Sequence, residues 1–289
     1  MNESSDLVET LALERIEVNL FRGLAPKGEG PRIFGGLVIA QALLAAYKTV
    51  DASICHSIHC YFLRPGDPSI PILYEVDRAR DGRSFTSRRV TAIQHGEQIF
   101  NLAGSFQHPE SGLEHQDPMP DVPGPGDLSD ERELRRTMLA KLPAAMRQMA
   151  DRPRPIEMRP VDPSDFMAAK PMPPVQNVWM RATAPIGDDV IFNQAALAYA
   201  SDMSFLSTSM RPHAMGWQTP GLQTASIDHA IWFHRPSNFN DWHLYAQKSP
   251  SASGARGFNL GEIYTEDGRL VASTAQEGLM RYRPPAMET

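Results

Sequence analysis

The stretch Gly-Leu-Val-Ile-Ala-Gln-Ala-Leu-Leu-Ala-Ala-Tyr, from Gly36 to Tyr47, predicts a helix in an unusual environment. It is apolar all round except at Gln41, whereas a surface helix shows a polar stripe along one side. At 1.5 Å per residue such a helix is about 18 Å long, and it must be enclosed by the rest of the fold. The segments around it are predicted strands, so strands must enclose it. We therefore expect a sheet wrapped round one central helix.

A second segment repeats this pattern. Asn193 to Leu206 contains an apolar, alanine-rich run that leads to Ser201 and Asp202. Its composition predicts a second enclosed helix, with Asp202 inside it. The chain is therefore expected to carry the same arrangement of helix and sheet twice.

The strand-like segments also occur as two similar sets. Cys60–Pro65 reads Cys-Tyr-Phe-Leu-Arg-Pro and Ile231–Pro236 reads Ile-Trp-Phe-His-Arg-Pro, so in each set an Arg-Pro pair ends an apolar strand. Further along, His95-Gly96 and Asp267-Gly268 each stand where a hairpin turn joins two strands. Both observations indicate an internal duplication.

The length and the proline distribution suggest where the two copies join. A chain of 289 residues exceeds the size at which one hydrophobic core usually stops growing. Of its 25 prolines, 13 lie between Pro109 and Pro174, as in a connector. We expect an N-terminal unit at residues 1–108, a connector at 109–153 and a C-terminal unit at 154–289. Within the connector, Ser129 is expected to cap a helix running from Asp130 to about Gln148.

Bulk composition excludes several classes of protein. The net charge is −6 and no run of basic residues is present, so a nucleic-acid partner is not expected. No segment approaches the roughly 18 apolar residues of a membrane span. Cys55 and Cys60 are the only cysteines, and their odd spacing places them on opposite faces of a strand, which excludes a disulfide framework. The N-terminus has no secretory signal pattern, so the cytoplasm is the expected location.

Six segments in the right order carry a resemblance to a known family. They are Phe34–Leu43, His56–Asp67, Tyr199–Asp202, Ser226–His229, Trp232–Pro236 and Gln276–Gly278. From about Leu13 to Arg283 the sequence resembles the acyl-CoA thioesterase II family. The resemblance implies an α+β double hot-dog fold, in which two fused units each wrap an antiparallel sheet round a central helix. It also implies hydrolysis of fatty acyl-CoA thioesters without a cofactor, in a homodimer or homotetramer.

The resemblance places the family's catalytic residues on Asp202, Ser226 and Gln276. The family more commonly has Thr where this chain has Ser226, so the hydroxyl is kept but the methyl group that restricts χ1 is lost. Our hypothesis is that Ser226 works with slightly looser positioning than Thr.

These residue types suit thioester hydrolysis, which needs a water, a group to accept its proton and donors for the developing oxyanion. Asp202 has apolar neighbours one turn away on each side, and desolvation makes a carboxylate a stronger base. It is expected to act as general base or water anchor. Ser226 and Gln276 are expected on two strands, where they would orient the water without competing as bases. Taken singly, Asp202 also fits a structural carboxylate, and Ser226 and Gln276 also fit ordinary polar strand residues.

Substrate-binding candidates are less specific. Gly35 and Gly36 precede the first helix, where free amides favour negative charge, although plain packing explains them equally well. Coenzyme A phosphates require cations, and the candidates near strand ends are Arg64, Arg88, Arg89 and Arg256. His56 is a candidate for orienting substrate, with a core or surface role as the alternative.

The sequence gives less support to a metal site, to a serine nucleophile and to other functions. A metal site is not expected, because His56 and His59 should face opposite ways on a strand and no matching ligand pair follows. No Gly-x-Ser-x-Gly elbow is present. His229 and His234 are interpreted as structural, with Asp228 as a partner for one of them. The alternatives are an acyl-CoA hydratase or dehydratase on the same fold, which usually pairs a His with a carboxylate, and a non-catalytic acyl-CoA-binding protein.

Overall fold

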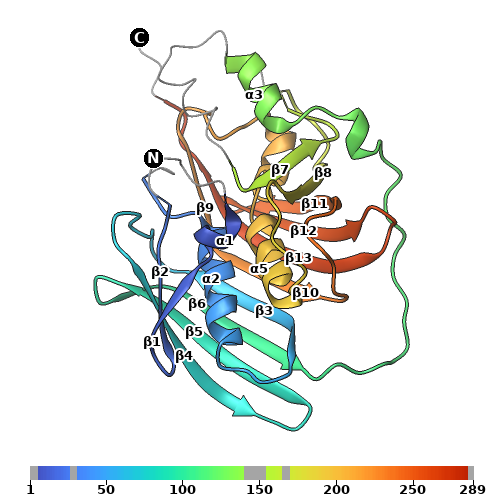
Figure 1. Cartoon of the computed structure of the whole chain (residues 1–289). Helices are drawn as coiled ribbons and strands as arrows, with labels where there is room; N and C mark the ends of the chain where they lie inside the picture. The colour runs from blue at the N-terminus through green and yellow to red at the C-terminus, as the bar shows by residue number, and fades with distance from the viewer. Residues whose placement is uncertain (1–5, 27–30, 140–153, 165–169, 286–289) are drawn as a thin grey trace.

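The protein folds as one large antiparallel sheet that curls round two central helices, α2 (Gly35–Tyr47) and α5 (Val190–Ser201) (Figure 1). This computed structural model describes residues 6–26, 31–139, 154–164 and 170–285. Among these residues no helix is long and apolar enough to cross a membrane.

Thirteen strands make up the sheet in the described residues. Those of the first half are β1 (Leu13–Glu17), β2 (Leu20–Gly23), β3 (Ile54–Phe62), β4 (Ile72–Asp81), β5 (Phe85–Gln94) and β6 (Glu97–Gln107). Those of the second half are β7 (Ile156–Pro160), β8 (Val175–Ala182), β9 (Leu222–Ser226), β10 (Asp228–Phe233), β11 (His243–Ser253), β12 (Arg256–Thr265) and β13 (Leu270–Tyr282). The shorter helices are α1 (Leu7–Thr10), α3 (Glu131–Leu139), α6 (Ser207–Met210) and the 3₁₀ turns Pro125–Asp127 and Arg211–His213.

The order of the strands shows the duplication. The sheet runs β1-β2-β4-β5-β6-β3-β10-β13-β12-β11-β8-β7, with β9 paired to β13. Read from its centre, where β3 pairs with β10, each strand of one half has a counterpart in the other: β6 with β13, β5 with β12, and β4 with β11. Each half encloses one helix, which confirms the predicted α+β double hot-dog fold. The predicted boundaries at 108 and 153 stay a prediction.

Enclosure of α2 is as complete as its composition predicts. Its residues from Leu37 to Leu43 have at most 4% of their surface exposed. Gln41, the polar exception, has all its side-chain groups satisfied: its Nε2 donates to the Thr10 and Leu24 carbonyls at 2.9 and 3.1 Å, and its Oε1 accepts from the Tyr74 hydroxyl at 2.8 Å. A buried amide with its hydrogen bonds made avoids the penalty of desolvation.

The two central helices lie side by side and run in opposite directions (Figure 1). At one end, the start of α2 meets the end of α5, where a side chain on Gly36 would clash with the Tyr199 carbonyl oxygen. At the other end, the Tyr47 hydroxyl of α2 donates to Gln194 of α5. The positive N-terminus of α2 therefore lies against the C-terminus of α5.

The predicted end of the second helix and the predicted faces of Cys55 and Cys60 were wrong. The second helix ends at Ser201, not Leu206, because Ser204 adopts a left-handed conformation with φ of 61°, so Asp202 is the C-cap instead of an internal residue. In β3 the pairing register shifts between Cys55 and Ser57, which is a bulge. Since one extra residue changes which face the side chains take, Cys55 and Cys60 are both buried in the core despite their odd spacing.

The described part of the connector, residues 109–139, contains a helix and packs against the sheet. Helix α3 begins at Glu131, one residue later than expected, because Asp130 and not Ser129 caps it, accepting from the Arg132 amide at 3.0 Å. The predicted helix beyond residue 139 lies outside the described residues. Before α3 the connector packs against the second half of the sheet, where Pro123 accepts from the Trp179 indole at 2.9 Å.

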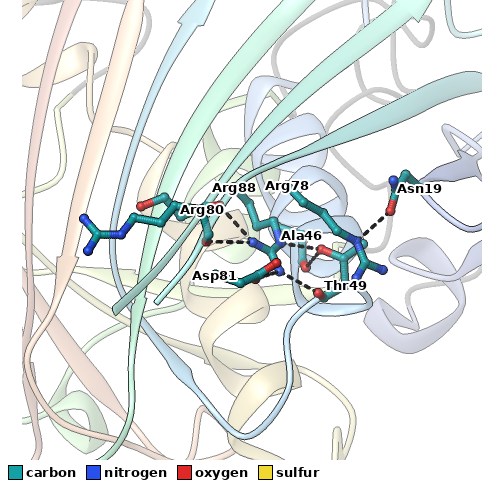
Figure 2. Close-up of polar contacts among 8 residues, drawn as sticks. Asn19, Ala46, Thr49, Arg78, Arg80, Asp81 and Arg88 are labelled. Atoms are coloured by element: carbon teal, nitrogen blue, oxygen red, sulfur yellow. Dashed lines mark hydrogen bonds and ion pairs between the residues drawn. The ribbon is translucent and has the colours of Figure 1, made fainter. Parts of the chain in front are cut away.

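A buried arginine holds the far end of α2. Arg88 on β5 is 2% exposed, and its guanidinium donates to the Thr49 hydroxyl and carbonyl, at 2.9 and 2.8 Å, just after α2 ends (Figure 2). It also donates to the Arg80 and Ser87 carbonyls at 3.1 and 2.9 Å and pairs with Asp81. A cation at the C-terminus of a helix complements the helix dipole. Here all the N–H groups of the guanidinium donate to these partners within the protein.

We predict that Arg88→Met destabilises the protein strongly, because the carbonyls that Arg88 satisfies would stay buried without a donor. The expected loss is roughly 2 to 4 kcal/mol in the free energy of unfolding, measured by urea denaturation. Arg89→Met is the matched control, since Arg89 is exposed on the same strand and its removal should cost less than about 0.5 kcal/mol. Equal effects of the two variants would contradict a structural role for Arg88.

Candidate active site

Asp202, Ser226 and Gln276 come together at the end of α5. The Gln276 amide donates from Nε2 to Asp202 Oδ1 at 2.6 Å, and the Ser226 hydroxyl donates to the same oxygen at 3.3 Å. Gln276 Nε2 also lies 3.4 Å from Ser226 Oγ. Residues 74 and 50 positions apart in the chain thus form one cluster around a carboxylate.

Strand register brings the two partners of Asp202 to the same face of the sheet. Ser226, the last residue of β9, pairs with Gly278 of β13, two residues from Gln276. Side chains two apart on a strand share a face, so Ser226 and Gln276 are diagonal neighbours. Both were expected on strands, and Ser226 lies at the end of a short strand instead of at the start of a long one.

The first turn of α2 completes the cluster. The Gly36 backbone amide hydrogen-bonds the Asp202 carboxylate. A Cβ on Gly35 would lie 2.6 Å from Asp202 Oδ2, so the space beside that oxygen exists only because residue 35 has no side chain. The sequence left packing and anion binding open for these glycines. The structure gives Gly36 a packing role against Tyr199 and an electrostatic role toward Asp202.

Burial raises the pKa of Asp202 to about 6, because desolvation disfavours its charged form. The hydrogen bonds from Gln276, Ser226 and Gly36 act in the opposite direction and hold the pKa below the value that burial alone would give. Asp202 is therefore ionised at neutral pH, yet it is a stronger base than an exposed aspartate. The sequence predicted that apolar surroundings make Asp202 a stronger base, and its burial agrees with that prediction.

Sequence reasoning missed the participation of His229. This buried residue of β10 lies with Nδ1 at 3.1 Å from Gln276 Nε2 and with Nε2 at 2.9 Å from the Ser201 hydroxyl. The expected pairing with Asp228 is wrong for this histidine, because Asp228 accepts from the Glu277 amide at 2.6 Å. His234, the other histidine considered, lies 2.9 Å from the Ser273 hydroxyl.

Asn259 was missed as well. It pairs with Gln276 across β12 and β13 and is fully buried. Neither atom of its carboxamide has a hydrogen-bond partner among the described residues, and the same holds for Gln276 Oε1. Unpaired buried amide atoms are costly and rare, so three of them on Asn259 and Gln276 need an explanation such as a bound water or a catalytic role. No pattern in the sequence distinguishes this asparagine from other strand residues.

The other half of the molecule lacks the cluster. Ile58 and Arg88 flank Gly104 on β3 and β5, as His229 and Asn259 flank Gln276 on β10 and β12. Gly104 has no side chain, and Arg88 extends to Thr49 at the end of α2 (Figure 2). The duplicated fold therefore carries the carboxylate cluster at one end of the helix pair and a structural arginine at the other.

The substrate-binding candidates lie in different places. Arg64 is half-exposed two residues beyond Phe62, whose ring packs near Gly35, and it pairs with Glu97 at 2.9 Å. Arg256 pairs with Glu277 at 2.8 Å. Arg88 is buried with its donors in use, so the geometry gives no support to a phosphate-binding role for it.

His56 lies away from the helices. Its Nε2 is 2.8 Å from the Ser105 hydroxyl, and its ring packs edge-on against the exposed Phe85. The exposed His59 packs against Trp232, so the bulge in β3 puts both histidines on the outer face, and the expectation of opposite faces was wrong. The geometry gives no support to His56 as a substrate-orienting residue. In the described part of the chain no group of three or more metal-ligating side chains occurs.

Comparisons with known proteins agree on one family. Residues 147–279 match the family model described as acyl-CoA thioesterase, and residues 25–107 match that of the acyl-CoA thioesterase N-terminal domain. Acyl-CoA thioesterase 2 of Haemophilus influenzae is 40% identical over 96% of this chain and 98% of its own length. Acyl-coenzyme A thioesterase 8 of Homo sapiens is 42% identical over 99% and 92%. The crystal structure of acyl-CoA thioesterase II TesB2 from Mycobacterium marinum superposes with a TM-score of 0.77 at 41% identity, covering 96% and 98% of the two chains.

The hydrogen bonds to Asp202 predict how its pKa changes in two variants. Carbonyl-detected NMR titration should give Asp202 a pKa of about 6. Gln276→Leu should raise that pKa further, since it removes the 2.6 Å donor that stabilises the carboxylate, and Ser226→Ala should raise it less because its hydrogen bond is longer. A fall in the pKa of Asp202 in either variant would contradict this assignment.

Proposed function

Since the chain belongs to the acyl-CoA thioesterase family, we propose that it hydrolyses acyl-CoA to a free fatty acid and coenzyme A with a water held by Asp202, Ser226 and Gln276. The observation that carries the assignment of residues is the position of Asp202. Its carboxylate has a raised pKa, two polar side chains bonded to it and the positive end of α2 beside it. Perturbed carboxylates with such partners are typical of catalytic sites.

The proposed reaction uses the carboxylate as a base. Asp202 takes a proton from the water as the water oxygen bonds to the thioester carbonyl carbon, and a tetrahedral oxyanion forms. The oxyanion then collapses, the carbon–sulfur bond breaks, and the thiolate of coenzyme A takes up the proton. One acyl-CoA and one water thus give one carboxylic acid and one thiol.

The remaining groups position the water and the carbonyl. Ser226 and Gln276 hold the carboxylate oxygen Oδ1 and leave Oδ2 on the side next to Gly35. Because residue 35 has no side chain, a water can lie against Oδ2 there, next to the thioester carbonyl carbon that it attacks. The N-terminus of α2, which has no side-chain cap, presents its positive end to the charge that develops on the oxyanion.

The alternative reactions fit the geometry less well. A hydratase or dehydratase of this fold usually needs a histidine that faces the substrate, but both ring nitrogens of His229 are occupied, one by Ser201 and one by Gln276. A protein that only binds acyl-CoA has no need of a buried carboxylate tuned toward neutral pH. The expected homodimer or homotetramer and the expected cytoplasmic location stay predictions from the sequence.

We predict that Asp202→Asn strongly slows thioester cleavage without unfolding the protein. Loss of a positioned base should lower release of free thiol from acyl-CoA by about 10²- to 10⁴-fold. Burial raises the pKa of Asp202 from 3.8 to about 6 in the folded state, so this group lowers stability as pH rises from 3.8 to about 6, and an uncharged Asn should leave stability at pH 7 equal or higher. Asp228→Asn, a nearby carboxylate outside the cluster, is the matched control and should retain activity.

The pH profile offers a second check on the same residue. Because the base must be ionised, kcat/KM should fall as pH drops through about 6 and level off above it. Near-normal thiol release by Asp202→Asn, or an acid limb near pH 4, would rule out Asp202 as the base.

The hydroxyl of residue 226 should matter more than its methyl group. Ser226→Ala should lower kcat by about 10-fold, the equivalent of one lost hydrogen bond of about 1.4 kcal/mol. Ser226→Thr keeps the hydroxyl and should stay within about 3-fold of the wild type, since only χ1 freedom changes. If the Thr variant were as slow as the Ala variant, the role assigned to Ser226 would be wrong.

A further inference from the structure

His229 is a buried titratable group that the proposed reaction does not use. It is 1% exposed on the inner side of β10, and its ring packs edge-on against Phe205 at 5.8 Å between centroids. Both of its ring nitrogens nonetheless have polar partners, Ser201 on α5 and Gln276 on β13. The ring therefore connects the helix that carries Asp202 to the strand that carries Gln276.

The hydrogen-bond network assigns the proton on this ring. The Ser201 hydroxyl donates to the Ala198 carbonyl at 2.9 Å, so its oxygen is left to accept from His229 Nε2. His229 Nδ1 then carries a lone pair and accepts from the Gln276 amide at 3.1 Å. The assignment follows from the partners and predicts a neutral imidazole protonated on Nε2.

This tautomer decides which way the Gln276 carboxamide faces. Both hydrogens of Nε2 meet acceptors, Asp202 Oδ1 on one side and His229 Nδ1 on the other. If the carboxamide were reversed, its oxygen would face a carboxylate and a nitrogen lone pair, which are two repulsive contacts. A histidine protonated on Nδ1 would instead favour that reversed orientation.

We propose that His229 is a positioning residue of the hydrolytic site, whose neutral ring, anchored to Ser201, fixes the orientation of the Gln276 carboxamide toward Asp202. This proposal rests on the proposed function, since it assigns His229 to the same water-holding cluster. His229 acts through Gln276 and does not itself touch the substrate.

The surroundings keep the ring neutral. Burial lowers the pKa of His229 to about 3, far below physiological pH. The ionisable groups around it come from four elements: Asp202 beyond Gln276, the Cys60 thiol on β3, the Tyr245 hydroxyl on β11, and Asp228, the residue before it on β10. Burial raises the pKa of the Cys60 thiol and the Tyr245 hydroxyl, so both stay uncharged.

The duplicated half of the fold gives an independent argument. At the position of Gln276 the first half has Gly104, and at the position of His229 it has Ile58, which is fully buried. An apolar side chain thus fills this inner position equally well when no carboxamide lies beside it. The histidine occurs in the half where the carboxamide occurs, as expected if it serves the carboxamide instead of the core.

The test compares two substitutions in the full-length enzyme. His229→Leu removes both hydrogen bonds at similar volume, and His229→Asn keeps an acceptor near the place of Nδ1. Thiol release from one acyl-CoA should show kcat about 10- to 100-fold lower in His229→Leu with KM changed less than about 3-fold, since a misplaced group near the reacting atoms costs on this scale. His229→Asn should recover to within about 10-fold of the wild type.

A double variant separates positioning from packing. If His229 acts through Gln276, then His229→Leu in a Gln276→Leu background should change kcat by less than about 2-fold, whereas independent effects would multiply. Multiplying effects, or an unchanged kcat in a folded His229→Leu variant, would overturn the proposal.

One measurement avoids variants that fail to fold. In the wild-type protein, ¹⁵N NMR of the His229 ring should show a neutral imidazole protonated on Nε2 from pH 5 to 8, and a proton on Nδ1 would overturn the proposal. The proposed function fails separately, if Asp202→Asn still releases thiol at a near-normal rate, whatever His229 does.

Discussion

The close contact between the start of α2 and the end of α5 is the constraint on which the site depends. Gly36 permits it, because any side chain there would clash with the Tyr199 carbonyl oxygen. The contact brings the free amides of α2 to the carboxylate of Asp202, the C-cap residue of α5, so Asp202 is desolvated and yet receives a hydrogen bond from Gly36. Desolvation alone would raise the pKa of this carboxyl above about 6, while full solvation would make it a weak base. Helix packing therefore sets the basicity of Asp202 between these limits.

The two ends of the helix pair show how a duplicated fold divides its roles. At the end of α5 the protein holds a carboxylate whose ionised form is unfavourable for folding, which is a local loss of stability. At the end of α2 the corresponding space holds Arg88, which satisfies carbonyls that would otherwise be buried without a donor (Figure 2). Similar backbones thus carry one cluster that favours reactivity and one that favours stability. The two halves differ here at Gln276 and Gly104, and at Asn259 and Arg88.

Sequence patterns predicted the elements that depend on composition and missed those that depend on register. The apolar run from Gly36 to Tyr47 identified an enclosed helix, because burial on all sides leaves a compositional trace. The end of α5 was placed five residues too late, since the left-handed turn at Ser204 has no glycine to reveal it. The bulge after Cys55 also has no signal in the sequence, and it changes the face of β3 on which Cys55 and His56 lie. Arg88 was assigned to substrate because a sequence shows its charge but not the carbonyls that surround it.

His229 shows why the rest of the site could not be predicted from the sequence. On its own strand it is one inward-facing residue among apolar ones. Its role depends on a contact with Gln276 of β13, 47 positions away in sequence. Strands β9 and β10 both run along β13, so Ser226 and His229 reach Gln276 from the same neighbouring edge while Asn259 lies on the other side. A shift of one residue in that pairing would turn Gln276 to the outer face and separate it from Asp202. The chemistry of the cluster is therefore specified by sheet register as much as by the identity of its residues.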